Sequence, residues 1–402
     1  DRERKSFMKF RSSCSFTALI FILCLCGCNW GGPNIYIAGG AYQHGDSVPT
    51  GSEHAYLWLD GSPRKIPGGV EMPINEINWS GSEMPINEIN WSVASASGAG
   101  VIMAGAGYDS MTKNYTAMLW NNGTITNLTD GTEDAIASGI AVSGSDVYVA
   151  GTVADSTTNY PKAVYWKNGQ EIALTEGSEV SMASAIAISG TDIYVAGEKL
   201  ESWCISAGCV NPCCHAINDV PVTTFQGTYW KNGVEIDLPP NVGYSMMTTA
   251  IAISDGNVYV TGYQTNALSG PIFETVNLPL YWGPNGLSYL ALFNSNITGM
   301  ALSIAVSGED VYVGGYESDG SSFACYWLNG NPTPIAVSDS TESALGSSIA
   351  VSGGDIYMAG QQWDASTHLW VPYYWKNGVG TALAADASED GIASSIVVDA
   401  QQ

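Results

Sequence analysis

The chain has 402 residues, is 45% hydrophobic and only 13% charged, and carries a formal net charge of −25 at pH 7. Its 38 acidic residues far outnumber the 13 lysines and arginines. A chain this acidic repels phosphate backbones and anionic headgroups, which argues against nucleic acid or a bare lipid surface as a partner. Solubility is the alternative explanation for the same surplus of carboxylates.

Residues 1–27 predict a signal peptide. Residues 8–11 form a short basic start, and residues 16–25 form an apolar run that is too short to span a bilayer. Residues 1–7 precede the first methionine and can lie upstream of the true start. We therefore expect an exported protein.

The apolar run ends in Leu25-Cys26-Gly27-Cys28, which resembles the bacterial lipobox. The resemblance implies that Cys28 is lipidated and that residues 28–33 form a short tether to the bacterial cell envelope. The attached lipid would then be the only contact with the membrane. An ordinary secretory signal that is cleaved nearby is the alternative.

Beyond the signal, an apolar strand that ends in Gly is followed seven times by an aromatic strand that ends in Trp-x-x-Gly, or in Trp-x-x-x-Gly at Trp282. Successive Trp residues are 45 to 64 positions apart, a spacing typical of a radial or stacked repeat array. The Gly-terminated strands are residues 34–39, 101–105, 147–151, 193–197, 258–262, 311–315 and 356–360, and the aromatic strands carry Trp58, Trp120, Trp166, Trp230, Trp282, Trp327 and Trp375.

The clearest repeat covers residues 183–238 and contains four predicted strands. A tight turn joins the first two, and Asn232-Gly233, a strong hairpin signal, joins the last two. Four antiparallel strands in each of seven repeats predict an all-β, seven-bladed β-propeller over residues 34–402. The adjacent Tyr and Trp of each aromatic strand are expected to pack against the two neighbouring blades.

The two ends of the repeat array are complementary. The first repeat lacks an inner strand because the chain enters directly at Asn34, whereas the last repeat has a surplus inner strand at residues 394–398. Pairing of residues 394–398 with residues 34–39 would complete blade 1 and remove the open sheet edge. The sequence therefore predicts a ring that is closed by its own C-terminal strand.

One repeat resembles a known type. Residues 53–61 read Glu-His-Ala-Tyr-Leu-Trp-Leu-Asp-Gly, and residues 163–169 are a looser copy. This pattern resembles the HAF-type repeat of bacterial extracellular proteins, whose core reads His-Ala-Phe-x-Trp-x-x-Gly. Residues 185–190 and 195–197 match the later segments of that repeat. The resemblance implies an extracellular propeller-like repeat and brings no catalytic residues.

The strands of each predicted blade, named A to D from the central channel outward, place the connections on two faces. The uniform face carries the A–B turns, such as residues 189–192, and the C–D turns, most of which read x-Asn-Gly. The varied face carries the B–C and D–A connections, which include a tandem copy of EMPINEINWS at residues 71–80 and 83–92. Because loops on a rigid scaffold usually carry binding function, we expect the ligand site on the varied face.

The varied face is also acidic, and its D–A connections supply the candidate ligand-binding residues. Clustered carboxylates can hold Ca²⁺ or meet a basic partner. No loop shows the ligand run of a calcium site, so we predict no cofactor, with Ca²⁺ as the alternative. The aspartates of the A–B turns are expected to bond their own backbone. The candidate residues are Asp130, Glu133, Asp134, Glu176, Glu179, Asp339, Glu342, Asp386, Glu389 and Asp390.

Residues 198–226 form a Cys-rich insertion in the fourth blade, and its four cysteines are expected to make two disulfides in an exported protein. The two adjacent cysteines pair poorly with each other, which leaves two connectivities open. A metal site is the alternative, although a CxxC pair is lacking. Cys325, in a predicted strand, is expected to be a buried, inert thiol. The disulfide candidates are Cys204, Cys209, Cys213 and Cys214, paired 204–213 with 209–214 or 204–214 with 209–213, and the metal candidates are Cys204, Cys209, Cys213 and His215.

No catalytic motif stands out from the repeat. The four histidines lie in no Ser/His/Asp or His-Glu-x-x-His pattern, and Arg64 is the only Arg beyond residue 27, which argues against sialidase-like chemistry. We therefore predict a non-enzymatic, surface-displayed binding or adhesion module with a protein or glycan ligand. The alternatives are a polysaccharide-acting glycosidase or lyase, for which two carboxylates suffice, and a scaffold subunit of a cell-envelope complex.

Overall fold

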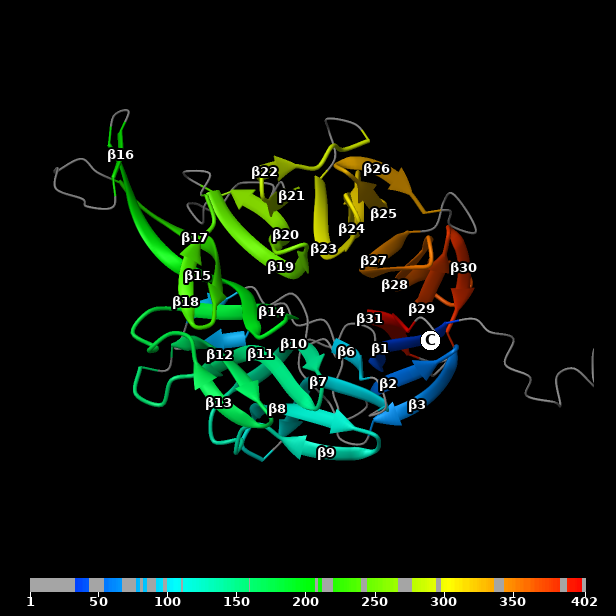
Figure 1. Cartoon of the computed structure of the whole chain (residues 1–402), viewed down its shortest axis with the longest axis horizontal. Helices are drawn as coiled ribbons and strands as arrows, with labels where there is room; N and C mark the ends of the chain where they lie inside the picture. Colours follow the sequence, from blue (N-terminus) through cyan, green and yellow to red (C-terminus); the bar gives the residue numbers. More distant parts are fainter. Residues whose placement is uncertain are drawn as a thin grey trace, which may run out of the picture.

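Seven sheets surround a central axis in the computed structural model of the chain (Figure 1). The described residues form strands and no helix, and each of the seven sheets contains a path of four antiparallel strands. The predicted seven-bladed β-propeller is therefore confirmed. Within the described ranges, no helix is long and apolar enough to cross a membrane. These ranges are residues 33–42, 54–66, 77–79, 82–84, 92–96, 100–109, 111–158, 160–206, 209–211, 220–239, 244–266, 277–293, 298–335, 343–383 and 389–399.

The first four blades contain the following strands, given from the channel outward as A to D. Blade 1 has β31 (Asp390–Asp399), β1 (Asn34–Tyr42), β2 (His54–Leu59) and β3 (Ser62–Ile66). Blade 2 has β6 (Ser92–Ala96), β7 (Gly100–Asp109), β8 (Asn114–Asn121) and β9 (Thr124–Asn127). Blade 3 has β10 (Ala135–Ser143), β11 (Asp146–Ala154), β12 (Pro161–Lys167) and β13 (Gln170–Ala173). Blade 4 has β14 (Ser181–Ser189), β15 (Asp192–Ser206), β17 (Val220–Lys231) and β18 (Val234–Asp237).

The remaining three blades follow the same order without additional strands. Blade 5 has β19 (Tyr244–Ser254), β20 (Asn257–Asn266), β21 (Leu278–Gly283) and β22 (Gly286–Tyr289). Blade 6 has β23 (Thr298–Ser307), β24 (Asp310–Ser318), β25 (Ser322–Leu328) and β26 (Asn331–Pro334). Blade 7 has β27 (Ala344–Ser352), β28 (Asp355–Asp364), β29 (Leu369–Lys376) and β30 (Val379–Ala382). The strands β4 (Ile77–Trp79) and β5 (Ser82–Met84) pair with each other in the connection between blades 1 and 2, and β16 (Cys209–Asn211) pairs with β15 in blade 4.

The ring is closed by its last strand. β31 pairs antiparallel with β1, with Tyr36 opposite Val397 and Ala38 opposite Ser395. Figure 1 shows this contact as a red strand beside a blue one. The predicted pairing of residues 394–398 with residues 34–39 is confirmed, and it covers the inner edge of β1.

A β-bulge occurs in the A strands of six blades and explains the Gly that stands opposite it in the B strand. The B strands continue beyond this Gly, in blade 3 as far as Ala154, so the prediction that they end at the Gly is wrong. In blade 4, Ala183 pairs with Gly197 and Ala185 with Ala196, so Ser184 is an extra residue. Equivalent register shifts occur in five further blades. The bulge brings the Met182 carbonyl so close to Gly197 that a Cβ there would collide with its oxygen. Only Gly fits opposite this bulge.

Each aromatic strand fills the space between two blades. Trp230 of blade 4 packs on Tyr148 and Ala150 of blade 3. Trp58 of blade 1 packs on Tyr357 of blade 7, across the closure. Five of these Trp side chains are almost completely buried. The expected role of the Tyr-Trp pairs in blade packing is confirmed.

Small polar residues of the A strands join neighbouring blades around the channel. Ser184 Oγ lies 2.8 Å from Thr248 Oγ1 in the next blade. Thr249 Oγ1 donates to the carbonyl of Ala301, again one blade on, at 2.8 Å. The Ile349 N–H donates to Ser303 Oγ at 3.1 Å in the same way. These contacts explain why the innermost strands are rich in Ser, Thr, Ala and Gly.

Candidate functional site

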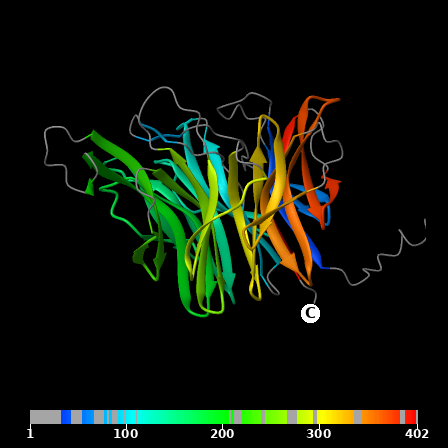
Figure 2. The same ribbon diagram turned by 90° about the horizontal axis from the view of Figure 1, so that it is seen from above.

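The A–B turns and C–D turns lie together at one end of the strands, on the uniform face, and the strand ends that the B–C and D–A connections join lie at the other end (Figure 2). In blade 4, Asn232 Nδ2 donates to Asp192 Oδ1 at 2.9 Å, and Asn232 Oδ1 accepts the Ile193 N–H at 2.9 Å. Lys231 Nζ lies 2.9 Å from Asp192 Oδ2 and 5.1 Å from the ring centroid of Tyr194. The hydrogen bonds from Lys231 and Asn232 lower the pKa of Asp192.

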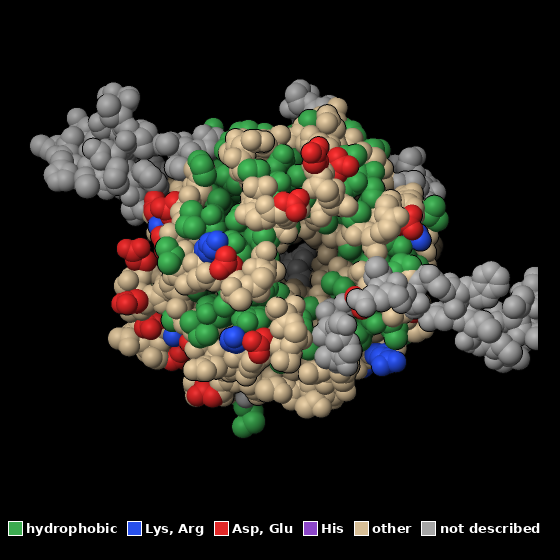
Figure 3. All heavy atoms as spheres, in the orientation of Figure 1, with side chains coloured by type: hydrophobic (Ala, Val, Ile, Leu, Met, Phe, Trp, Pro, Cys, Tyr) green, Lys and Arg blue, Asp and Glu red, His purple; other side chains and the backbone are tan. Residues whose placement is uncertain are grey.

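This cluster recurs in blades 3 and 7, so it belongs to the repeat. Figure 3 shows lysines beside acidic side chains on this face. The prediction that these aspartates bond the backbone of their own turn is wrong. Their carboxylates bond the Asn of the C–D turn and the Lys that precedes it. The equivalent residues are Asp146, Tyr148, Lys167 and Asn168, and Asp355, Tyr357, Lys376 and Asn377.

Two of the predicted ligand-binding acids are bound within the fold. Asp134 Oδ1 accepts the Tyr115 N–H at 2.8 Å, and Asp390 Oδ1 accepts the Trp370 N–H at 2.7 Å. Each acid stands at the start of an A strand and bonds the C strand of the preceding blade. Ser245 uses its hydroxyl at the equivalent position to accept the Phe225 N–H at 3.2 Å. Burial raises the pKa of Asp134. These carboxylates therefore join blades.

The other predicted acids fall into four groups. Asp130 Oδ1 accepts the Thr132 hydroxyl at 2.6 Å and its N–H at 3.0 Å, which lowers the pKa of Asp130. Glu133 and Glu389 are partly buried, and Glu176 and Glu179 are exposed. In the part of the chain that the structure describes, no three or more His, Cys, Asp or Glu side chains form a group that could hold a metal. The remaining candidates, Asp339, Glu342 and Asp386, lie outside the described residues.

The Cys-rich segment is a lengthened B–C hairpin. β15 and β17 stay paired as far as Ile205 and Val220, and Figure 1 shows this hairpin projecting from the disc with β16 at its tip. The backbone register places Cys204 opposite Asn211 and Cys209 opposite Ser206. The disulfide and metal hypotheses stay predictions, because the other members, Cys213, Cys214 and His215, lie outside the described residues.

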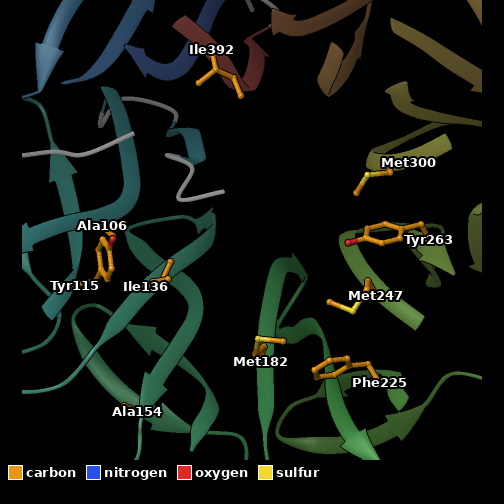
Figure 4. Packing of buried hydrophobic residues seen from close by; sticks show 10 residues of the cluster. All are labelled: Ala106, Tyr115, Ile136, Ala154, Met182, Phe225, Met247, Tyr263, Met300 and Ile392. Atoms are coloured by element: carbon orange, nitrogen blue, oxygen red, sulfur yellow. The ribbon is translucent and has the colours of Figure 1, made fainter. Parts of the chain in front are cut away.

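The central channel contains a cavity of about 710 Å³. Met182, Met247 and Met300 stand at one register position of their A strands, near the ends where the varied-face connections enter. Figure 4 shows these three side chains and Tyr263 directed toward the open centre. The varied-face end of the channel is thus lined by thioethers and an aromatic ring.

Glu198 is the one Asp, Glu, Lys, Arg or His among the described residues that line this cavity. Its side chain is only 4% exposed. Glu198 Oε2 accepts the Thr248 hydroxyl at 2.8 Å and the Thr248 N–H at 3.2 Å. Burial raises the pKa of Glu198 to about 7, against the lowering effect of the two Thr248 hydrogen bonds. A carboxyl with these properties in a cavity is a candidate functional group.

Sequence reasoning missed Glu198, although a signal for it existed. The residue that follows the B-strand Gly is Thr152 in blade 3, Tyr263 in blade 5 and Tyr316 in blade 6, and all three line the cavity. An acid at that position departs from the repeat. The predicted insertion at residues 198–226 begins at this position, so the pattern of the repeat does not single it out.

The thiol of Cys325 was placed correctly. Cys325 is completely buried opposite Gly315 in blade 6. Burial raises the pKa of this thiol well above its usual value, and the nearby Glu317 adds to the shift. The side chain is part of the packing beneath Trp327.

Comparison with known proteins shows likeness of fold alone. No family model matches the chain, and no curated protein sequence matches it. The resemblances to HAF-type repeats and to a lipobox therefore stay predictions. The chain spans less than half of hydrazine synthase, and structural likeness this remote carries no argument about activity. The similar structures include the β-propeller domain of the trilobed protease from Pyrococcus furiosus (12% identity, covering 74% of this chain and 97% of that chain, TM-score 0.38), TolB from Acinetobacter baumannii (10%, 90% and 82%, 0.38) and hydrazine synthase from Kuenenia stuttgartiensis (11%, 92% and 47%, 0.43).

Proposed function

We propose that this chain is a non-enzymatic binding module whose protein or glycan ligand enters the central channel from the varied face. The observation that carries the proposal is the cavity of about 710 Å³, whose wall combines methionine and tyrosine side chains, serine and threonine hydroxyls and a single hydrogen-bonded carboxyl. Binding sites typically pair apolar side chains, which give affinity, with polar groups that fix the orientation of the ligand.

The same cavity favours binding over polysaccharide hydrolysis. Glycoside hydrolysis normally requires two carboxyl groups that flank the scissile bond. Among the described lining residues Glu198 is the only carboxylic acid. A scaffold subunit would use the varied face without placing any group in the channel, so blocking the channel separates this alternative from the proposal.

Export to the bacterial cell envelope is part of the proposal. It is supported by the signal-like residues 1–27, by the lipobox-like sequence that ends at Cys28 and by the resemblance to HAF-type repeats. A lipid on Cys28 would hold the uniform face toward the membrane, because β1 begins on that face. Cells labelled with a palmitate analogue should give a labelled protein that Cys28→Ala abolishes. Equal labelling of both proteins would contradict lipidation at this residue.

A channel-blocking variant tests the binding function directly. Leu302 lines the cavity, and Leu302→Trp would place an indole in it. The neutral dye Nile red should fluoresce with the wild-type chain and far less with Leu302→Trp. Ligands that the wild type binds on a glycan and peptide array should no longer bind Leu302→Trp. Lys231→Met, on the uniform face, is the control and should bind as the wild type does. A folded Leu302→Trp protein that keeps all binding, or turnover of a polysaccharide, would contradict the proposal.

A further inference from the structure

We propose that the group bound in the channel is a primary ammonium attached to an apolar body, and that Glu198 accepts hydrogen bonds from that ammonium. This inference rests on the proposed function, since it requires that the channel takes a ligand. It names the chemistry of the group that enters, which an amine, a lysine side chain or an amino sugar can supply.

The carboxyl is held in a fixed orientation. Thr248 contributes its hydroxyl and its N–H to Oε2, and the Thr248 hydroxyl lies 2.8 Å from Ser184 Oγ. All three residues line the cavity. A side chain that is 4% exposed and bonded through one oxygen cannot turn away from its neighbours. Such pre-organisation reduces the entropy that binding costs.

The second oxygen is free to receive the ligand. Among the described residues, no donor bonds Glu198 Oε1. Because Glu198 lines the cavity, a ligand N–H can bond this oxygen without displacing a protein donor. An ammonium supplies both the proton donor and the opposite charge, which makes the hydrogen bond stronger than one from a neutral group.

No protein cation competes for Glu198. The next residue, Lys199, points to the other side of the strand and contacts Glu235, Asp237 and Glu201 at 2.5, 3.0 and 3.3 Å. The described parts of β14 and β19, which pack beside Glu198, carry no Asp, Glu, Lys, Arg or His. Lys231, on β17, is bound to Asp192 on the uniform face. The charge of an ionised Glu198 is therefore available to a ligand.

Methionine and tyrosine side chains near Glu198 fit the apolar body of such a ligand. Met182, Met247 and Met300 offer flexible thioethers, and Tyr263 and Tyr316 offer aromatic rings. Thioethers adapt to alkyl and aryl groups, and the face of an aromatic ring attracts a cation. The Tyr316 hydroxyl lies 2.8 Å from the sulfur of Met300, which holds one ring beside one thioether. An anionic ligand would be repelled by the carboxylate.

Three probes of similar shape test the inference: phenethylammonium, phenethyl alcohol and 3-phenylpropionate. Calorimetric titration of the full chain at pH 8 should show the ammonium bound at least about tenfold tighter than the alcohol, and the propionate not bound. Glu198→Gln keeps the shape of the side chain and should lose about tenfold in affinity for the ammonium alone. At pH 5.5 the wild type should weaken, because protonation of Glu198 removes its charge, while Glu198→Gln should not change.

Glu317→Gln is the matched control. Glu317 is also a buried Glu on a B strand, and its Oε2 accepts the Phe293 N–H at 3.0 Å, but it does not line the cavity. This variant should bind the ammonium as the wild type does. If Glu198→Gln does not fold, Glu198→Asp keeps the charge, withdraws it from the ligand and should still weaken ammonium binding.

The outcomes separate the inference from the proposed function. If Nile red enters the channel but the ammonium does not bind, or binds no better than the alcohol, the inference is wrong and the proposed function stands. Unchanged ammonium affinity in Glu198→Gln would also overturn the inference. If neither Nile red nor the ammonium binds, both fail.

Discussion

The uniform face and the varied-face end of the channel lie at opposite ends of the same strands and use polar residues differently. On the uniform face, Asp192, Lys231 and Asn232 satisfy one another, and the same set recurs in two other blades. At the other end, Glu198 occurs in one blade, where the corresponding residue of the next blade is Tyr263. Polar groups that repeat belong to the scaffold, whereas a polar group that breaks the repeat marks the site.

The largest effect should come from the scaffold itself, at Gly197. A Cβ here would collide with the Met182 carbonyl and lie 2.8 Å from the ring of Trp230. We expect Gly197→Ala to lower the free energy of unfolding by roughly 4 kcal/mol, measured by urea denaturation.

Gly227→Ala in the same blade is the control for this substitution. Its new methyl would meet the side chains of Thr248, Leu238 and Trp282 at 3.3, 3.5 and 3.5 Å, contacts that small movements can relieve. We expect a loss below about 1 kcal/mol. Equal losses of stability in Gly197→Ala and Gly227→Ala would show that the bulge does not require Gly at position 197.

The next effect is the pH dependence of stability that Glu198 should produce. Burial raises the pKa of Glu198 from 4.5 to about 7, so the unfolded chain loses this proton at a lower pH than the folded chain. The protonated Glu198 side chain therefore adds to the free energy of unfolding in full below about pH 4.5. This contribution is lost as the pH rises through 7, which lowers the free energy of unfolding by roughly 3 kcal/mol. Unfolding of wild type and Glu198→Gln at pH 4.5 and pH 8, without ligand, measures it. A constant difference between the two proteins would mean that Glu198 is well solvated.

The contrast between repeat and exception also explains what the sequence could predict. The Gly and Trp positions recur seven times, and the complementary ends at residues 34–39 and 394–398 follow from the same count, so fold and closure could be read directly. Glu198 occurs once. The bulge at Ser184 shifts the register by one residue, so that Glu198 pairs with Met182, and this bulge cannot be seen in an isolated strand.

For the acids of the D–A connections, too, the sequence could not predict which side chains bond the fold and which are exposed. Composition alone makes Asp134 and Glu179 equivalent, because both stand in polar loops of the varied face. In the structure Asp134 reaches the Tyr115 N–H of the preceding blade, whereas Glu179 is exposed. The difference lies in the position relative to the first residue of the A strand, and that boundary is the least predictable part of a strand from sequence.

A smaller effect is expected at the Asn of the uniform face. Asn232 has a φ of 50°, accepts the Ile193 N–H and donates to Asp192. Asn232→Ala would lose both hydrogen bonds and place Ala in the left-handed region, at a cost of about 1 to 2 kcal/mol in denaturant unfolding. Asn168→Ala and Asn377→Ala should cost the same. A large difference among the three losses in free energy of unfolding would show that the same cluster geometry stabilises the three blades unequally.

The smallest effect should follow from Lys231→Met. Lys231 and Asp192 are 41% and 37% exposed, so water and salt screen their interaction. We expect the melting temperature to change by no more than about 1 °C, because exposed ion pairs add little to stability. Binding of phenethylammonium should be unchanged as well, since Lys231 lies at the far end of the strand from Glu198. A variant in which Lys167, Lys231 and Lys376 are all replaced by Met extends the test to the whole uniform face. If that triple variant lost ammonium binding while keeping its melting temperature, the uniform face would have to take part in recognition. The hypothesis that the uniform face is structural and that only the varied-face end of the channel binds the ligand would then be wrong.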